Sequence, residues 1–438
     1  MLETLNRAFR TPELRNRILF TLGVITLFRL GSFIPAPGVN YTNVQQCLKQ
    51  SSNSGGIQDM INMFSGGALL QLSIFALGIM PYITASIIVQ LLRVVIPHFE
   101  ALYQEGQTGN AKLTQYTRYL TIVLAILNGT TIITLARSGN LLQGCSLPLI
   151  PDQSFGAILL MVITLTAGTS LIMWLGEMIT EKGIGNGMSI LIFTSVAASF
   201  PTSLGAIRVS HGWGVFSLII AVGLLIVALV VFVEQSQRRV PVQYAKRMVG
   251  TRTVEGSSNT YIPIKVNMAG VIPIIFASSI LMVPTMVAQY FAPSDGSNPP
   301  AWVNWIQKHL VSGDDPVYML IYFILVVFFA FFYVGITFNP DEVADNMKKY
   351  GGFIPGVRAG NSTAEYLHYV INRITTPGAI YIGIISLIPM VALALFGANQ
   401  SFPFGGASLL IIVGVGLDTV KQLNAKLQQH NYEGLLRD

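Results

Sequence analysis

Ten long stretches of the sequence contain almost no charged residue, and this feature restricts the fold most. Each is about 20 residues long, enough for a tilted helix to cross a hydrocarbon core of about 30 Å. None alternates with the period of two that strands of a membrane barrel require. We therefore predict an all-α polytopic membrane protein with ten transmembrane helices, in the ranges 18–36, 69–92, 119–136, 155–176, 186–204, 213–233, 269–291, 317–338, 376–397 and 402–420.

The start of the chain is similar to a secretory signal peptide, because several arginines precede the first apolar stretch. That stretch is too long for the hydrophobic region of a signal peptide, and Ser32–Pro37 contains no A-x-A cleavage site. We therefore expect residues 18–36 to be retained as the first span.

Lysine and arginine lie mainly on one side of the predicted spans. Of the 26 in the chain, four fall in outer loops, one lies within a span, and 21 fall in the N-terminus, 93–118, 177–185, 234–268, 339–375 and the C-terminal tail. Cytoplasmic loops carry the excess of basic residues, so both termini are predicted to face the cytoplasm. With 52% hydrophobic and 11% charged residues, the chain is not an ordinary water-soluble enzyme.

Two segments of the chain are similar to each other. Gly78–Ile88 and Gly270–Ile280 share Gly, Pro, Ile, Ala, Ser and Ile at the same offsets, although chance recurrence remains open. Five spans per half would invert the second half, so the similarity favours an inverted repeat with a central site. We predict two pseudo-symmetric halves of five helices around a central pore, an N-terminal half at 1–204 and a C-terminal half at 205–438.

The predicted spans contain almost no ionisable side chains, which ion-coupled transporters and pumps need at mid-depth. Arg29 is the exception, and we expect its guanidinium to extend toward the outer interface. A pore narrowed by aliphatic side chains cannot select ions by coordination and gates by dewetting. The expected cargo is therefore large and variable.

No catalytic or metal-binding motif is recognisable. The five histidines are dispersed, Ser189 has no motif around it and no identifiable base, and no phosphate-binding G-x-x-x-x-G-K-[ST] occurs. We predict no enzymatic activity, no cofactor and no metal site. Cys47 and Cys145 fall in loops predicted on the same side, so a disulfide between them remains open.

A short outer segment between the first two spans is also irregular. Ile57–Phe64 has the pattern of one amphipathic helix, which Ser65, Gly66 and Gly67 interrupt before the next span. Non-helical backbone near a membrane is tolerated where it is buried in protein or lines a cavity, so the segment could fold inward as a stopper. A short helix on the outer leaflet is equally open.

The two long cytoplasmic loops, 234–268 and 339–375, exceed what topology requires. Arg239–Tyr244 and Tyr261–Val266 alternate around a polar turn, which predicts a hairpin. Asn339 followed by Pro340 predicts a capped helix start, and Gly356–Gly360 predicts a turn that presents Arg358. The basic residues could simply fix orientation, but the loop lengths favour a docking surface for an acidic partner, for example RNA phosphates.

Several motifs, collinear over essentially the whole chain, closely resemble the bacterial SecY family, the channel-forming subunits of the general protein-secretion translocon. These motifs are Phe64–Ala68, Ser73–Ile83, Trp174–Glu177, Gly183–Gly187, Arg238–Arg239, Tyr244–Arg247, Lys265–Pro273 and Phe338–Pro340. The resemblance implies a channel that passes unfolded secretory polypeptides across the membrane and releases hydrophobic segments sideways into lipid.

The resemblance also implies roles for particular residues. A central ring would consist of Ile79, Ile83, Met188, Ile192, Ile275 and Ile411, with Met188 replacing the more usual isoleucine. A plug would span 57–68 and include Ile57, Met60, Ile61, Phe64, Ser65, Gly66 and Gly67. A lateral gate between the second and third spans and the seventh and eighth would have a polar seam of Thr84, Ser86, Asn128, Ser278 and Ser279.

The implied partners are the SecE and SecG subunits, the SecA ATPase motor, the ribosome, polypeptides bearing signal sequences, and membrane lipid, but not DNA. The motor or ribosome would dock at Arg238, Arg239, Lys246, Arg247, Arg252, Lys348, Lys349 and Arg358. The implied location is the bacterial plasma (inner) membrane. The alternative from another class is an inverted-repeat secondary transporter of a small solute, which would also have ten spans and broken helices.

Overall fold

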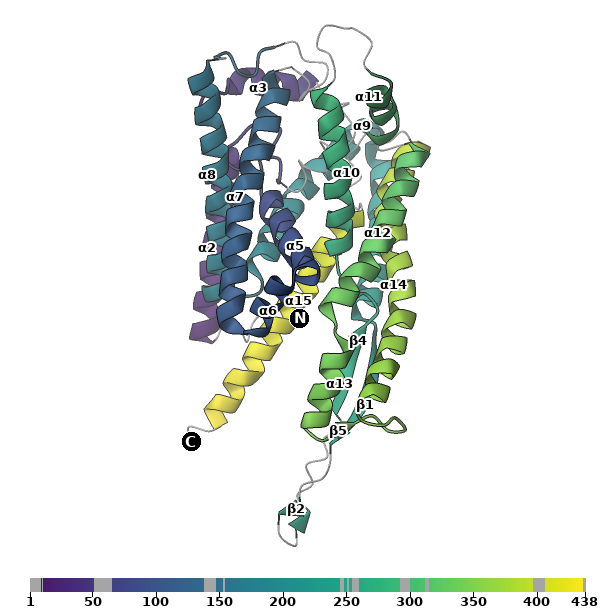
Figure 1. Ribbon diagram of the computed structural model, residues 1–438. Helices are drawn as coiled ribbons and strands as arrows, with labels where there is room; N and C mark the ends of the chain where they lie inside the picture. The colour runs from purple at the N-terminus through teal and green to yellow at the C-terminus, as the bar shows by residue number, and fades with distance from the viewer. Residues whose placement is uncertain are drawn as a thin grey trace.

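Helices account for most of the chain in the computed structural model (Figure 1). The structure describes residues 9, 11–50, 65–137, 147–152, 154–244, 248–249, 252–253, 260–291, 300–311, 315–396 and 406–435. The helices are α2 (Pro12–Phe33), α3 (Tyr41–Gln50), α5 (Met80–Val95), α6 (Pro97–Gln104), α7 (Gln107–Arg137), α8 (Phe155–Lys182), α9 (Gly187–Gln235), α10 (Ile272–Tyr290), α11 (Ala301–Ile306), the π-helix η1 (Gln307–Val311), α12 (Pro316–Thr337), α13 (Pro340–Lys349), α14 (Asn361–Phe396) and α15 (Gly406–Leu435). The strands are β1 (Gln237–Tyr244), β2 (Met248–Val249), β3 (Arg252–Thr253), β4 (Thr260–Lys265) and β5 (Gly352–Phe353).

The predicted all-α membrane architecture is confirmed. Six helical stretches among the described residues are long and apolar enough to cross a bilayer, and the pair α5 and α6, bent by 101°, makes a seventh. Two shorter apolar helices, Gly187–Pro201 and Ile272–Thr285, and the arginine-containing α2 occupy three further predicted ranges. All ten predicted ranges therefore overlap helices, which is consistent with ten spans.

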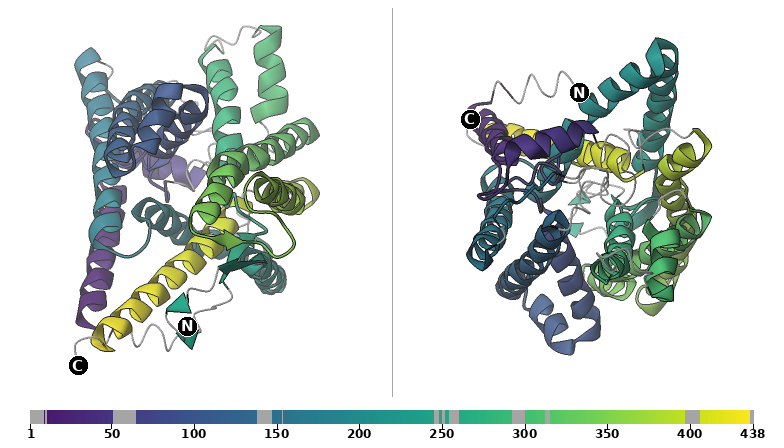
Figure 2. Two further views of the ribbon diagram at one scale, coloured as in Figure 1. Left: turned by 60° about the horizontal axis from the view of Figure 1, so that its bottom comes forward. Right: turned by 90° about the horizontal axis from the view of Figure 1, so that it is seen from above.

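The helices form two groups. Figure 1 shows α2, α7 and α8 on one side and α10, α12 and α14 on the other, and both views in Figure 2 show α15 crossing between them. Helix α9 covers two predicted spans and is interrupted by Gly212, whose φ of 75° and ψ of −177° are not helical. It runs through residue 204 without a break, so the boundary at 204 and 205 stays a prediction.

The second predicted span, 69–92, is wrong as one continuous helix. Residues 65–79 form turns and α5 begins only at Met80. Gly66, Gly67 and Gly78 have positive φ, as does Leu72, and this interrupts helical geometry. The turn backbone bonds to the end of the first span instead: the Ala36 amide donates to the Leu72 carbonyl, and the Ile74 amide to the Ile34 carbonyl, both at 2.9 Å.

The two similar segments start their helices in the same way. Gly78 has φ 56° and α5 starts two residues later, whereas Gly270 has φ 60° and α10 starts two residues later. Proline follows at the second helical position in both, where its missing N–H costs no helical hydrogen bond. The repeat therefore extends from sequence to backbone conformation.

The hairpin predicted in the loop 234–268 is confirmed. Strands β1 and β4 pair antiparallel, with Arg239 opposite Pro263, and β5 from the second long loop adds to β1, giving the order β4-β1-β5. The Asn339 side chain accepts hydrogen bonds from the Asp341 and Glu342 amides and so caps α13 as predicted. Figure 1 shows α15 leaving the bundle at the same end as this sheet.

The opposite end carries the short helices α3 and α11 (Figure 1). Cys47 lies on α3, is fully buried and is disulfide-bonded. Cys145, the other cysteine of the chain, lies outside the described residues.

Candidate functional site

A cavity of about 700 Å³ lies where the two groups of helices meet, and many of the side chains that line it are aliphatic. Five of the six predicted ring residues line it, namely Ile83, Met188, Ile192, Ile275 and Ile411. The sixth, Ile79, is 2% exposed and packs in one cluster with Ile192 and Ile411. The structure therefore brings the predicted ring together from α5, α9, α10 and α15.

The ring residues lie at or near the first turns of their helices. Ile79 is the N-cap of α5, Met188 is the second residue of α9, and Ile275 is the fourth residue of α10. The N-cap Asn186 accepts hydrogen bonds from the Met188 and Ser189 amides and fixes the start of α9. Helices that start inside the molecule can direct their first aliphatic side chains at a common centre.

Charged residues also line this cavity. Arg118 on α7 donates to both carboxylate oxygens of Glu177 on α8, through Nε at 2.9 Å and Nη2 at 2.8 Å. A bidentate pair of this kind fixes two side chains as well as two helices. Sequence reasoning missed the pairing, and its only signal was that both residues fall at cytoplasmic span ends.

Two further pairs of polar side chains in the lining of this cavity join elements of the C-terminal part of the chain. The side-chain Nδ2 of Asn267 donates to Glu234 Oε1 at 2.6 Å. The Oδ1 atom of Asn267 accepts from the backbone amide of Gly270 at 2.9 Å. Lys265 Nζ lies 3.3 Å from Asp418 Oδ1, which connects β4 to α15. The lining of the cavity thus combines joined charged residues with aliphatic side chains.

The predicted lateral seam lies where α10 contacts α5 and α7. Thr84, Ser86 and Asn128 are partly buried on α5 and α7. Ser278 donates to the Ile275 carbonyl at 2.9 Å, whereas the buried Ser279 hydroxyl has no hydrogen-bond partner among the described residues. The structure therefore places all five seam residues on the three contacting helices.

Arg93 on α5 connects the two groups of helices through a hydrogen bond to α12. Its Nη2 atom donates to the Ile336 carbonyl at 3.3 Å, in the last turn of α12, and its guanidinium stacks 3.7 Å from the Tyr103 ring centre. The last carbonyls of a helix lack intrahelical partners, and a cation near them is favourable. A residue of α5 thus caps a helix of the other group.

Only the end of the predicted plug lies within the described residues. Ser65 Oγ accepts from the Leu69 amide at 3.1 Å, and the Gly66 carbonyl accepts from Arg29 Nη1 at 3.0 Å. A carbonyl within the protein thus binds Arg29, and its extension toward the outer interface stays a prediction. The remaining predicted plug residues lie outside the described residues: Ile57, Met60, Ile61 and Phe64.

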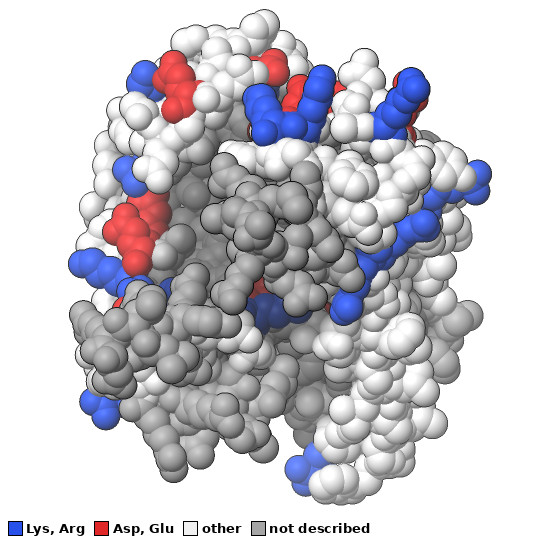
Figure 3. All heavy atoms as spheres, turned by 90° about the horizontal axis from the view of Figure 1, so that it is seen from below, with Lys and Arg blue, Asp and Glu red and all other residues white. Residues whose placement is uncertain are grey.

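The predicted docking residues gather at the end of the molecule that carries the sheet. Arg238 and Arg239 are exposed on β1, Lys348 and Lys349 are exposed at the end of α13, and Arg358 is exposed in the following turn. Figure 3 shows basic and acidic side chains spread around this face. Arg252 belongs to β3, and Lys246 and Arg247 lie outside the described residues.

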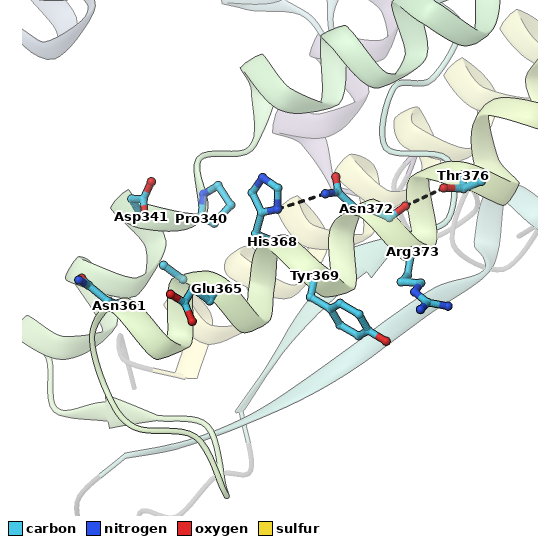
Figure 4. Close-up of a pocket in the computed structure, with 10 residues that line it drawn as sticks. Pro340, Asp341, Asn361, Glu365, His368, Tyr369, Asn372, Arg373 and Thr376 are labelled. Carbon is cyan, nitrogen blue, oxygen red and sulfur yellow. Dashed lines mark hydrogen bonds between the residues drawn. The ribbon is translucent and has the colours of Figure 1, made fainter.

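A second cavity, of about 780 Å³, lies on the same end between the start of α13 and α14. Figure 4 shows His368 and Asn372 directed along one side of α14, joined by a 3.1 Å hydrogen bond. The Arg373 guanidinium lies 5.2 Å from the Tyr369 ring centre. Sequence reasoning missed this polar groove, since its residues recur at helical spacing inside a loop that was not assigned a long helix.

A family model and full-length relatives of this chain carry the same family name, SecY. A family model described as SecY matches residues 73–420. A Streptomyces galbus protein named protein translocase subunit SecY is 62% identical, and a Micrococcus luteus protein of the same name is 59% identical, each over the whole length of both chains.

Two solved structures share the fold at low sequence identity. A structure described as a protein conducting channel has a TM-score of 0.62 at 18% identity, covering 94% of this chain and 92% of the other. Sec61 in a canine ribosome-channel complex from the endoplasmic reticulum has a TM-score of 0.58, also at 18% identity, with the same coverage. The match of the family model and the full-length identity to the bacterial relatives show that the chain belongs to the SecY family.

Proposed function

We propose that this chain is a protein-conducting channel, and not an enzyme, through which unfolded secretory polypeptides cross the membrane. The observation that supports this most is the predicted ring, because its aliphatic side chains come together from α5, α9, α10 and α15 around one central cavity. Membership of the SecY family supports the same function. The comparisons give no support to the alternative of a small-solute transporter.

The closed ring acts as a seal because water and ions gain no hydrogen bonds or ligands from aliphatic side chains. A passing polypeptide displaces the ring side chains and then contacts only their aliphatic surface, which offers no fixed hydrogen-bond partners. Met188 contributes a flexible thioether that adapts to chains of different shape. Passage therefore requires no particular sequence in the cargo.

Sideways release would use the seam between α10 and the pair α5 and α7. The contacts there include small polar side chains, and Arg93 adds one hydrogen bond between the groups. Separation of the seam exposes these groups to an incoming hydrophobic segment and lipid. The segment 57–68 serves as the plug on the outer side of the ring.

The chain works with partners at its cytoplasmic face. The exposed basic residues of β1, α13 and the turn at Arg358 would dock the SecA motor or ribosomal RNA phosphates. The companion subunits in this proposal are SecE and SecG, and the ribosome complex of Sec61 supports ribosome docking. The location is the bacterial plasma membrane with both termini in the cytoplasm, as the distribution of lysine and arginine favours.

A photocrosslinker placed at Ile83 or Ile275 should capture a stalled secretory precursor, because both side chains line the central cavity. The measurement uses vesicles reconstituted with the full chain, its companion subunits and a motor, after protected precursor has shown translocation. The matched control is a crosslinker at Leu224 of α9, which is 62% exposed on the outside of the bundle. Capture from Leu224 alone, or no translocation of precursor, would contradict the proposed path.

Reversing the charge at Arg358 should reduce motor-driven translocation at least tenfold, because like charges brought together in an interface cost several kcal/mol and about 1.4 kcal/mol is already a factor of ten. Arg358 is exposed in the turn between β5 and α14. Lys308→Glu is the control, since Lys308 is exposed on η1 in the outer loop. Equal rates for Arg358→Glu and Lys308→Glu at matched protein levels would remove Arg358 from the docking surface.

A further inference from the structure

Arg29 is a cation inside the first span, and the charge-poor interior gives it no acidic partner that the structure records. Its Nη1 atom instead donates to the Gly66 carbonyl at 3.0 Å, and its guanidinium lies 5.2 Å from the Phe33 ring centre. We propose that Arg29 is a positioning residue that holds the turn Ser65–Gly67 on the outer side of the ring and so keeps the resting channel sealed. This inference rests on the proposed channel function.

The turn fits against Arg29 closely. Gly66 has φ +66°, and a Cβ added there would lie 2.8 Å from Arg29 Nη1 and 3.2 Å from the Ser195 Cα. The carbonyl that accepts the hydrogen bond thus belongs to a residue enclosed by α2 and α9. Only glycine places its backbone between these helices in this conformation.

The helix that carries Arg29 is fixed to the same segment at a second point. Phe28 stacks on Phe75 with ring centres 5.8 Å apart, and Gly31 lies directly against the Phe75 ring. Phe28 is 1% exposed and Phe75 is 4% exposed. The position of Arg29 relative to residues 65–79 is therefore set by packing, and its hydrogen bond needs no reorganisation of α2.

The turn and the ring are connected on both sides. Ser195, which contacts Gly66, lies one helical turn after Ile192 on α9, and residues 65–79 end at Ile79. If the turn moves away, the partly buried guanidinium of Arg29 loses the Gly66 carbonyl as its hydrogen-bond acceptor. An unpaired charge inside a membrane span is costly in free energy. Arg29 therefore favours the arrangement in which turn and ring are together.

The test compares Arg29→Met and Arg29→Lys with Arg208→Met, a matched loss of an exposed arginine that stacks 4.2 Å from the Trp213 ring centre. The resting ion conductance of the full chain with its companion subunits is measured in planar bilayers, together with translocation of precursors with intact or weakened signal sequences. We expect Arg29→Met to raise resting conductance about tenfold, the change expected on losing one hydrogen bond to a charged group. It should also improve use of the weakened signal, which a merely structural defect would not do.

Arg29→Lys retains a charged donor and should restore conductance most of the way to that of the unchanged protein. Gly66→Ala tests the other partner and should raise conductance, while the double variant with Arg29→Met should show less than the product of the two effects. Conductance of Arg29→Met equal to that of Arg208→Met, with normal translocation, would overturn the proposal, as would additive effects. Absence of translocation by the unchanged protein would instead reject the channel function itself.

Discussion

Replacing Ile192 and Ile411 together with asparagine is expected to raise resting ion conductance by on the order of a hundredfold. Exposing the side chain of one isoleucine to water costs about 1.5–3 kcal/mol, and this cost opposes wetting of the ring. Each 1.4 kcal/mol changes the population of the wetted state by a factor of about ten. Ile192 on α9 and Ile411 on α15 are 8% and 2% exposed and pack in one cluster. Asparagine at both positions offers water hydrogen bonds across the narrowest point.

The matched control changes the same residue type away from the cavity. Ile163 on α8 and Ile384 on α14 are 56% and 55% exposed, one in each helix group. Ile163→Asn with Ile384→Asn should leave conductance close to that of the unchanged protein, measured as current across planar bilayers at equal protein density. A ring variant that still translocates precursor but conducts no more than this control would show that the ring is not the seal.

Gly168→Ala is expected to destabilise the fold strongly. A Cβ at residue 168 would collide with the carbonyl oxygen of Ile74, because α8 passes directly against the turns of residues 65–79. Backbone cannot move aside as a flexible side chain does, so we expect about 3 kcal/mol of lost stability, at the upper end of the range for overpacking. Unfolding in detergent, followed by protease resistance, measures the loss.

Gly156→Ala on the same helix is the control. Nothing lies within 4 Å of a Cβ added at Gly156, so alanine should be neutral or slightly stabilising there through its higher helix propensity. Equal protease resistance of the two variants would mean that α8 does not approach residues 65–79 as closely as the structure shows.

Local chemistry allowed several features to be predicted from the sequence. The start of α13 follows from Asn339 and Pro340, whose side chains act within one turn, and the hairpin follows from alternation on either side of a polar turn. The ring residues were identified through motifs resembling the SecY family, and five of them line one cavity. Their role in conduction stays a prediction.

Features that depend on contacts distant in sequence were not predicted. Apolar composition made residues 69–79 part of a span, but composition does not show that Gly66, Gly67 and Leu72 adopt positive φ or that residues 34–36 bind the turn. The acceptor of Arg29 was not predicted, because it is a backbone carbonyl, a group that every residue carries. The pairing of β5 with β1 was likewise hidden, since two residues are too few to give a strand pattern.

The pairing of β5 with β1 has a mechanical consequence. Strand β1 continues from α9, β4 leads into α10, and β5 lies between α13 and α14, so one sheet joins the ends of these four helices. Because the three strands are hydrogen-bonded to one another, a displacement of the sheet is transmitted to all four helices and not to a single one.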